Sequence, residues 1–435
     1  MSKVKDMIYN LPGIKKIKRK FDLQEARMDK IQSEYKLIAY ENIGLRLQLK
    51  RINNEKIRVV FVCHRPSLWE SLHSVYDALK ADERFEVLIV AIPSKDKKSG
   101  VMMEHEDYTC EGAEEFWKGY GCINGYDYEK KEWLDLRELK PDYVFFQQPY
   151  NIIRSAKYKS AYVSLFARIL YIPYGSQIIG EGIVESTNPR DFMQDVYCYF
   201  SPETYAYDEM RKWLADTHAK IVLTGFPRYD QFRKEIKQDA EIWKYKGDKK
   251  RFRIMWTPRW CTGEGNCTFF DYYHDILEYA RQNKEVEILF RPHPQAFREW
   301  RLTGEFTQKQ EERFREECAE VGIGIDEEGE YVSKLMTTDC FLTDPSSLMG
   351  EYFVTGKPII YSFRKDCFTK FGELLSEGYY NCKDWNEIKQ VLQELQNGKD
   401  VKQPIRKKIM KEVLAIPQEG IGSGIKDYII KESGF

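Results

Sequence analysis

The amino-acid sequence predicts two doubly wound α/β domains of similar size that face a cleft, preceded by an N-terminal helical segment. Three observations predict this fold. Apolar, β-branched runs typical of buried parallel strands recur through residues 57–361, helical stretches separate them, and the pattern occurs twice, on either side of a charged segment at 233–251. A chain of 435 residues has room for about two or three domains. We therefore expect domains at 1–55, 56–235 and 236–435.

Composition excludes several classes of protein. Apolar residues make up 42% and charged residues 31%, which is typical of a globular chain. Lys and Arg total 68 against 69 Asp and Glu, so we expect no nucleic-acid partner. The 10 cysteines form no C-x-x-C pair, which predicts neither a zinc site nor a disulfide framework. We expect no cofactor and no metal, and a soluble cytoplasmic protein or one held at a membrane surface.

The first twenty residues are basic. Residues 3–20 carry seven Lys and Arg against a single acid, Asp6, with apolar residues such as Ile14 and Ile17 among them. Such a segment can rest on anionic lipid, at about 1 kcal/mol per basic residue. A solvated charged helix interrupted at Pro12 is the alternative.

Residues 23–55 show a heptad pattern. Ile31, Ile38, Leu45 and Ile52 repeat every seven residues, and the neighbouring seam holds Met28, Tyr35 and Leu49, with Asn42 as its polar exception. This pattern predicts a coiled coil of about three to four heptads and a homo-oligomer formed through residues 23–55. A single amphipathic helix packed on its own domain is the alternative.

The predicted strands follow in two groups. The first domain has its strands at Ile57–Cys63, Phe85–Ala91, Tyr143–Phe146, Ile169–Ile172 and Ile221–Leu223, with a helix at Ser67–Leu79. The second has them at Arg253–Thr257, Val286–Phe290, Asp339–Thr343 and Pro358–Tyr361. From Asp384 onward the pattern is helical.

One candidate site residue is His293 in the sequence Arg291-Pro292-His293-Pro294, directly after a predicted strand. Ligands of open parallel sheets bind beyond the carboxyl ends of the strands. The prolines stiffen the loop and Arg291 adds a cation. These features favour a functional His293 over a structural one. His64 also follows a strand, but we expect it to be a hydrogen-bonded core or loop residue.

A second candidate lies at Thr343–Ser347, again at a strand end and before an expected helix from Leu348. Ser346 and Ser347 supply hydroxyls suited to a diphosphate, next to Asp344, and Glu351 one turn into the helix can bind a ribose diol. An ordinary helix cap is the alternative.

Three further motifs follow strands and can face the cleft. They are Thr224-Gly225-Phe226-Pro227-Arg228, Tyr174-Gly175-Ser176, and Trp256-Thr257-Pro258-Arg259-Trp260, which offers an aromatic surface beside a cation. Each by itself is first a turn signal.

Taken in order, T-G-F-P-R, W-T-P-R-W, R-P-H-P, T-D-P-S-S and G-K-P-I-I-Y resemble the CDP-glycerol glycerophosphotransferase family, which builds teichoic-acid-like poly(glycerol phosphate) chains in bacterial envelopes. The resemblance covers about residues 170–365. It implies a two-Rossmann glycosyltransferase-like (GT-B) fold, a CDP-glycerol donor, a polymeric or lipid-linked acceptor, and a peripheral position on the inner face of the membrane.

The resemblance also implies roles for particular residues. His293 and Arg291 would be catalytic, and Ser346 and Ser347 would hold the diphosphate. The other expected contacts to CDP-glycerol are Asp344, Glu351, Pro258, Arg259, Thr224, Gly225, Arg228, Gly175 and Ser176.

One departure from the family pattern concerns the first domain. The family has a histidine where Tyr174 stands in this chain, and a tyrosine with a pKa of about 10 is a poor base near neutral pH. Tyr174 is therefore a catalytic candidate with an open role. Two other functions stay open: a transferase using CDP-ribitol or a nucleotide sugar, and a non-catalytic scaffold with a decayed cleft.

Overall fold

The structure of the chain is a computed structural model. It describes residues 12–95, 108–109, 113–180, 182–233, 243, 245, 250–328, 331–414 and 416–435. Most of the basic segment at 3–20 and of the charged segment at 233–251 lies outside the described residues or their described side chains. None of the described helices is long and apolar enough to cross a membrane.

The first unit is built on a seven-stranded parallel sheet in the order β11-β10-β9-β8-β1-β2-β5. The five strands predicted here are present, and a sixth long strand, β10, was not predicted. Each is buried on both faces, apart from the edge strands, as parallel sheets require. The strands are β1 (Ile57–Cys63), β2 (Phe85–Ala91), β5 (Ile123–Asn124), β8 (Tyr143–Phe146), β9 (Arg168–Tyr171), β10 (Val196–Ser201) and β11 (Lys220–Leu223).

Helices and two short hairpins complete this unit. The predicted helix at 67–79 is divided: a 3-10 turn, η1 (Pro66–Ser71), precedes α3. The helices are α3 (His73–Lys80), α4 (Ala113–Lys118), α5 (Ser160–Val163), α6 (Arg190–Met193) and α7 (Thr204–Trp213), and the hairpins are β3 (Ser94–Lys95) with β4 (Tyr108–Thr109) and β6 (Tyr126–Asp127) with β7 (Glu132–Trp133). Further 3-10 turns lie at η2 (Leu136–Leu139), η3 (Asn151–Ile153), η4 (Ala156–Tyr158) and η5 (Pro227–Arg233).

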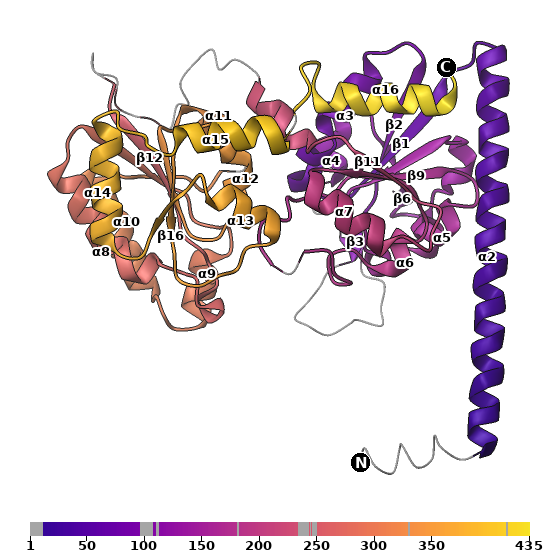
Figure 1. The fold of residues 1–435 in the computed structure, drawn as a ribbon, viewed down its shortest axis with the longest axis horizontal. Coiled ribbons are helices and arrows are strands. Elements are labelled where there is room, and N and C mark those ends of the chain that lie inside the picture. Colours follow the sequence, from indigo (N-terminus) through magenta and orange to yellow (C-terminus); the bar gives the residue numbers. More distant parts are fainter. Residues whose placement is uncertain are drawn as a thin grey trace.

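The second unit repeats the plan with a six-stranded parallel sheet in the order β14-β13-β12-β15-β16-β17. Its strands are β12 (Phe252–Thr257), β13 (Val286–Phe290), β14 (Gly324–Ile325), β15 (Cys340–Thr343), β16 (Ile359–Ser362) and β17 (Tyr380–Cys382). Its helices are α8 (Phe269–Gln282), α9 (Ala296–Leu302), α10 (Gln308–Val321), α11 (Val332–Thr337), α12 (Leu348–Phe353), α13 (Lys370–Ser376), α14 (Trp385–Gln396) and α15 (Gln403–Ile409), with turns η6 (Thr262–Glu264) and η7 (Met410–Leu414). The predicted fold class is therefore confirmed (Figure 1).

Strand order places a ligand crevice in each sheet. In the second sheet the chain runs outward from β12 to β13 and β14, then returns to form β15 on the other side of β12. The loops after β12 and β15 therefore diverge at their carboxyl ends, which is the usual ligand position of doubly wound folds. The corresponding point of the first sheet lies between β1 and β8. There His64 is buried, and its Nε2 lies 2.9 Å from Oε1 of Gln148, so the interpretation of His64 as a satisfied core residue is confirmed.

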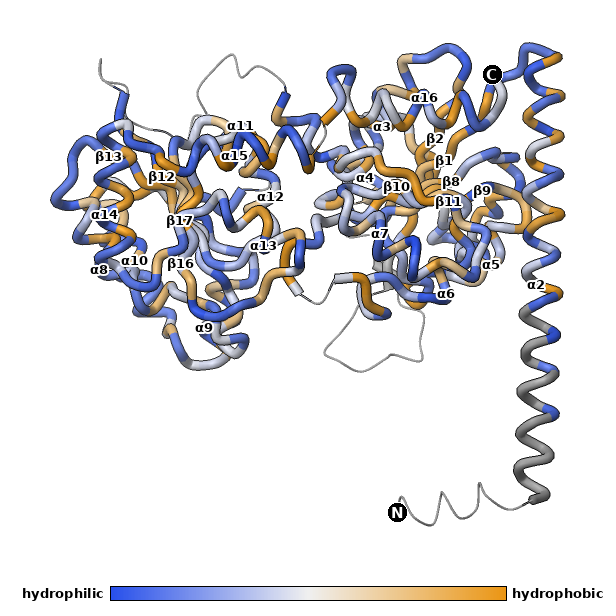
Figure 2. Tube along the Cα trace, in the orientation of Figure 1, coloured by the Kyte–Doolittle hydropathy of each residue, from blue (hydrophilic) through white to orange (hydrophobic). Residues whose placement is uncertain are grey.

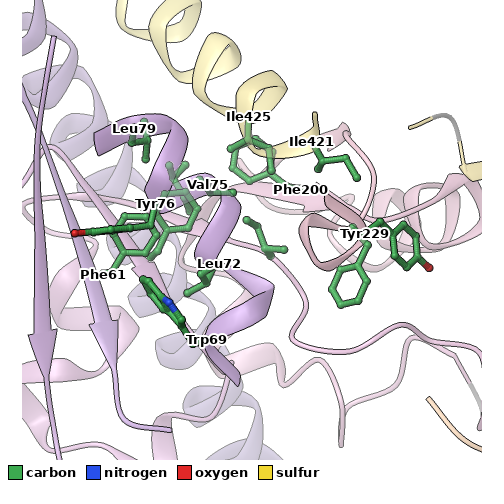
Figure 3. Close-up of a cluster of buried hydrophobic side chains, with 14 of the residues drawn as sticks. Phe61, Trp69, Leu72, Val75, Tyr76, Leu79, Phe200, Tyr229, Ile421 and Ile425 are labelled. Atoms are coloured by element: carbon green, nitrogen blue, oxygen red, sulfur yellow. The ribbon is translucent and has the colours of Figure 1, made fainter. Parts of the chain in front are cut away.

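The chain crosses between the units twice. It leaves the first unit through η5 and returns after η7 to form α16 (Ile421–Ser433), which packs on α3. Ile421 and Ile425 of α16 join Val75 and Phe200 in one buried cluster (Figure 3). Asp230 of η5 caps α16 by accepting from the backbone N–H groups of Ile421 at 2.9 Å and Gly422 at 2.8 Å.

The long N-terminal helix α2 (Pro12–Ile52) lies along the outer edge of the first unit, and its N-terminal half extends beyond it (Figure 1). Tyr40, Ile43 and Leu47 of α2 are buried in the hydrophobic core of that unit. Lys50 and Arg46 both pair with the buried Asp142, at 2.5 and 2.8 Å. The helix packed on its own domain is thus present. It uses a face other than the heptad seam, and Figure 2 shows apolar residues recurring along the coloured part of this helix.

Candidate active site

A cavity of about 270 Å³ lies at the carboxyl ends of β12, β13 and β15, at the crevice of the second sheet. One side chain of its wall, Arg228, comes from the first unit. Of the predicted site residues, His293, Arg291, Ser346, Ser347, Pro258, Arg259 and Arg228 line it. Tyr331, which the sequence analysis did not name, also lines it, as does Leu348, which was expected only as the start of a helix.

His293 is held in one orientation by two contacts. Its ring stacks on Trp260, with the ring centroids 5.4 Å apart, and its Nδ1 accepts a hydrogen bond of 3.2 Å from the backbone N–H of Gln295. Because Nδ1 is the acceptor, the proton of the neutral ring resides on Nε2. Partial burial, and then the charge of Arg259, lower the pKa of His293 below its ordinary value. At neutral pH the ring is therefore neutral and presents Nε2–H as a donor.

The guanidinium of Arg291 is held in place by residues outside the cavity wall. Its guanidinium pairs with Asp326 and donates to the carbonyl of Glu328 at 3.0 Å. Lys334 also pairs with Asp326, at 2.7 Å, so this buried carboxylate faces two cations. The guanidinium also lies over the ring of Tyr331, 5.4 Å from the centroid. Lys334 also pairs with Glu328 at 2.7 Å, so the ion pairs behind Arg291 hold its guanidinium in a fixed place in the cavity wall.

Ser346 and Ser347 lie where β15 gives way to α12. The hydroxyl of Ser346 accepts from the backbone N–H of Leu348 at 3.2 Å, and Ser347 is exposed at the N-cap position without a side-chain cap bond. Both hydroxyls can donate to an oxyanion in the cavity. Arg259 lies beside this turn, with its guanidinium 3.4 Å from the carbonyl of Pro345, and is partly neutralised by Glu264 at 2.7 Å.

Asp344 lies behind the cavity rather than in its wall. Its buried carboxylate accepts from the backbone N–H groups of Thr268 at 2.7 Å and Arg259 at 2.9 Å, and from the Thr268 hydroxyl. Burial raises the pKa of Asp344 to about 7. This side chain therefore ties the loop after β12 to the loop after β15.

Both carboxylate oxygens of Glu351 accept hydrogen bonds from other residues of the chain. One carboxylate oxygen accepts from Arg228 at 3.0 Å and the other from the hydroxyl of Tyr331 at 2.6 Å. The second guanidinium nitrogen of Arg228 donates to the carbonyl of Ser67 at 3.1 Å. Arg228 thus bridges the two units at the edge of the cavity. Glu351 is thus paired with the other unit, and its contact with a ribose diol stays a prediction.

Thr224 and Gly225 support this bridge without lining the cavity. Both donate backbone N–H groups to the carbonyl of Ser201, at 3.1 and 3.2 Å. Gly225 has a φ of +92°, which a residue with a side chain rarely adopts, and an added Cβ would lie 3.0 Å from Ile421.

Tyr174, Gly175 and Ser176 lie outside the cavity wall as well. The Tyr174 hydroxyl is 3.0 Å from that of Tyr150. Ser176 lies against α12, where a Cβ at Gly350 would be 3.2 Å from its hydroxyl oxygen. The residues that follow join the second unit: the hydroxyl of Thr369 donates to the carbonyl of Gln177 at 2.6 Å. The structure therefore brings this segment to the helix that follows Ser347, and Tyr174 is not among the residues that line the cavity with His293.

Similarity to solved structures places the molecule among two-Rossmann GT-B-like folds. A UDP-GlcNAc 2-epimerase from Neisseria meningitidis has a TM-score of 0.56 at 13% identity, covering 87% of this chain and 99% of that chain. A UDP-N-acetylglucosamine 2-epimerase from Listeria monocytogenes, described as putative, has a TM-score of 0.53 at 15% identity, covering 80% and 91%. A variant of the wall teichoic acid polymerase TagF has a TM-score of 0.54 at 13% identity, covering 91% and 98%. At these identities the likeness concerns the fold alone.

The sequence comparison is more specific. Residues 185–369 match the model of the family CDP-Glycerol:Poly(glycerophosphate) glycerophosphotransferase. The resemblance predicted from the five ordered motifs is confirmed over this segment, which contains the whole cavity wall. A search of curated proteins finds no match to this chain.

Proposed function

We propose that this protein transfers glycerol phosphate from CDP-glycerol to a hydroxyl of a cell-envelope glycan or teichoic-acid-like polymer and releases CMP. The observation that carries the proposal is the placement of His293, Arg291, Ser346 and Ser347 around one cavity at the crevice of the second sheet, within the segment that matches the family. All four are suited to phosphoryl oxygens.

The chemistry that this arrangement supports is mainly electrostatic. The oxygen of the acceptor hydroxyl attacks the β-phosphorus and its proton passes to water, while the bond from that phosphorus to the oxygen bridging it to CMP breaks and CMP leaves with that oxygen. Phosphoryl transfer depends on positioning and on stabilising charge on the phosphoryl oxygens. Ser346 and Ser347 would donate to the diphosphate. His293, neutral with its proton on Nε2, would donate to a phosphoryl oxygen rather than act as the base.

The test is release of CMP from CDP-glycerol with crude membranes as the source of acceptor. His293→Ala is expected to lower the rate by about 10²- to 10³-fold, the cost of removing one donor to a developing oxyanion. His274→Ala is the matched control, since His274 is exposed on α8 of the same unit and does not line the cavity. A His293→Ala rate within about threefold of wild type would refute the role of His293.

The donor is tested separately from the chemistry. CDP-glycerol is expected to raise the melting temperature more than CDP-ribitol or UDP-sugars. Ser346→Ala combined with Ser347→Ala should remove two hydrogen bonds to a charged group, about 1.5–3 kcal/mol each, and leave binding of cytidine nearly unchanged. Equal weakening of cytidine and CDP-glycerol would contradict the diphosphate assignment.

We also propose that the protein lies on the inner face of the plasma membrane through its basic N-terminus. The attraction of seven basic residues to anionic lipid is screened by salt, because the Debye length falls from about 10 Å at 0.1 M to 3 Å at 1 M. Deletion of residues 1–22 should release the protein from anionic vesicles in a sedimentation assay. Wild-type protein that stays in the supernatant at low salt would contradict this location.

A further inference from the structure

The seam of α2 is a regular coiled-coil surface left exposed by the fold. With Tyr35, Asn42 and Leu49 at position a of the heptad, position d is occupied by Ile31, Ile38, Leu45 and Ile52. The apolar members are 54–70% exposed: Ile31 54%, Tyr35 63%, Ile38 54%, Leu45 57%, Leu49 60% and Ile52 70%. Six large apolar side chains in one stripe exceed the scattered exposure that is ordinary on a protein surface.

The first unit cannot cover this stripe because it binds the other side of the helix. Tyr40, Ile43 and Leu47 are 7%, 2% and 1% exposed against that unit. At 100° per residue, their face lies roughly 150° around the helix from the seam. The N-terminal half of α2 also extends beyond the unit (Figure 1), so a second helix can approach without meeting the rest of the chain.

From this surface we infer that two copies of the chain associate through a parallel, in-register, two-stranded coiled coil of α2. The partner of the seam is identified as a second copy of α2 because the seam is complementary to itself in this arrangement. Asn42 is the single polar residue of the seam, and only in a parallel, in-register dimer does it meet its own counterpart. In an antiparallel pair it would face an apolar d residue and leave its amide unpaired in the interface.

The charges beside the seam select the same arrangement. Positions g and e hold Glu41 and Arg46, so a parallel interface places charges of opposite sign on facing edges, while Arg46 keeps its bond to Asp142. Glu34 at the preceding g position would meet the uncharged Ala39. An antiparallel pair centred near Asn42 would instead bring the two copies of Glu41 together. No like-charged pair arises in the parallel register over residues 31–52.

The same charges argue against lipid as the occupant. Glu34 and Glu41 are exposed directly beside the apolar stripe, where an anionic surface would repel them. Asn42 in the middle of the stripe would also be buried without a partner in acyl chains.

The experiment measures the mass of the full-length protein by light scattering after gel filtration at micromolar concentration. Wild type is expected at twice the chain mass of 51.7 kDa. Ile38→Glu combined with Leu45→Glu places four like charges in the interface and should raise the dissociation constant about 10²- to 10³-fold, giving a monomer. Leu37→Glu is the matched control, because Leu37 is 40% exposed on the same helix off the seam, and it should remain a dimer.

Orientation is tested by disulfide cross-linking. Asn42→Cys is expected to give a covalent dimer on mild oxidation, since a–a′ positions face each other only in the parallel register. Wild type and Leu37→Cys, oxidised alongside, should not. A wild-type monomer at micromolar concentration, a seam double variant that stays dimeric, or a dimer that Asn42→Cys does not cross-link would each overturn the inference. Wild-type monomer whose vesicle binding the seam variants abolish would identify lipid as the occupant instead.

Discussion

Gly422 of α16 lies against the backbone of α3, and replacing it with alanine should destabilise the first unit. A Cβ at this position would lie 2.3 Å from the carbonyl oxygen of Ser74 and 2.5 Å from its carbonyl carbon. The obstacle is backbone, so no side-chain rotation can relieve the contact. Helix α16 would have to move away from α3 by about 1 Å to reach an ordinary van der Waals separation.

The cost follows from what that movement separates. Overpacking of this kind costs about 1–3 kcal/mol. The displacement would also open the contact of Ile421 and Ile425 with Val75, all of them completely buried in the cluster of Figure 3. Gly424, two residues later in the same helix, has nothing within 4 Å of an added Cβ. There alanine should stabilise the helix by about 0.5–1 kcal/mol because glycine is the poorer helix former.

The two variants therefore have opposite expected signs and differ by about 2–4 kcal/mol in the free energy of unfolding. Urea unfolding followed by tryptophan fluorescence measures this, since Trp69 lies in the affected cluster. Catalytic activity under native conditions serves as a check that each variant folds. A Gly422→Ala midpoint equal to or above that of Gly424→Ala would refute the close approach of α16 and α3.

Three further predictions concern titration and capping. Because burial and then the charge of Arg259 lower the pKa of His293, its ring should lose its proton with a midpoint below the ordinary 6.5 in an NMR titration, and Arg259→Gln should move that midpoint upward. Burial raises the pKa of Asp344 to about 7, so the folded state binds this proton more tightly than the unfolded state. The contribution of Asp344 to the free energy of unfolding therefore falls as the pH rises from about 4 to 7. Urea unfolding at several pH values should show this decrease in wild type and not in Asp344→Asn. Asp230→Ala should cost about 0.5–2 kcal/mol by removing the cap of α16, and an unchanged urea midpoint would show that the cap contributes nothing.

Much of the fold can be predicted from local pattern. Buried parallel strands need apolar side chains on both faces, so Ile57–Cys63 and Val286–Phe290 are recognisable as continuous apolar runs. The strand-end rule likewise brings His293 and Ser346 to one cavity from positions far apart in the sequence. Strand β10 could have been found by the same signal, because Val196–Ser201 is fully buried and rich in aromatic and β-branched residues.

The rest depends on contacts that no local pattern encodes. The sequence does not show that the two carboxylate oxygens of Glu351 accept from Arg228 of the other unit and from Tyr331, which no motif marks. The position of Asp344 before a helix is typical of a helix cap, but its carboxylate instead joins the loop after β12 to the loop after β15 by accepting from Thr268. In the same way, the spacing of α2 predicts an apolar seam, but only the fold shows that Ile43 and Leu47 dock on the first unit and leave the seam outside.

The return of the chain to the first unit sets the order in which the protein can be completed during synthesis. All seven strands of the first sheet are synthesised before residue 224, yet α16, which packs on α3, is made about two hundred residues later. During that interval Val75 and Phe200 lack their partners Ile421 and Ile425, so the nascent first unit exposes apolar surface that invites chaperones or aggregation. The first unit is therefore synthesised first but completes its packing last. Truncation near the C-terminus should destabilise this N-terminal unit.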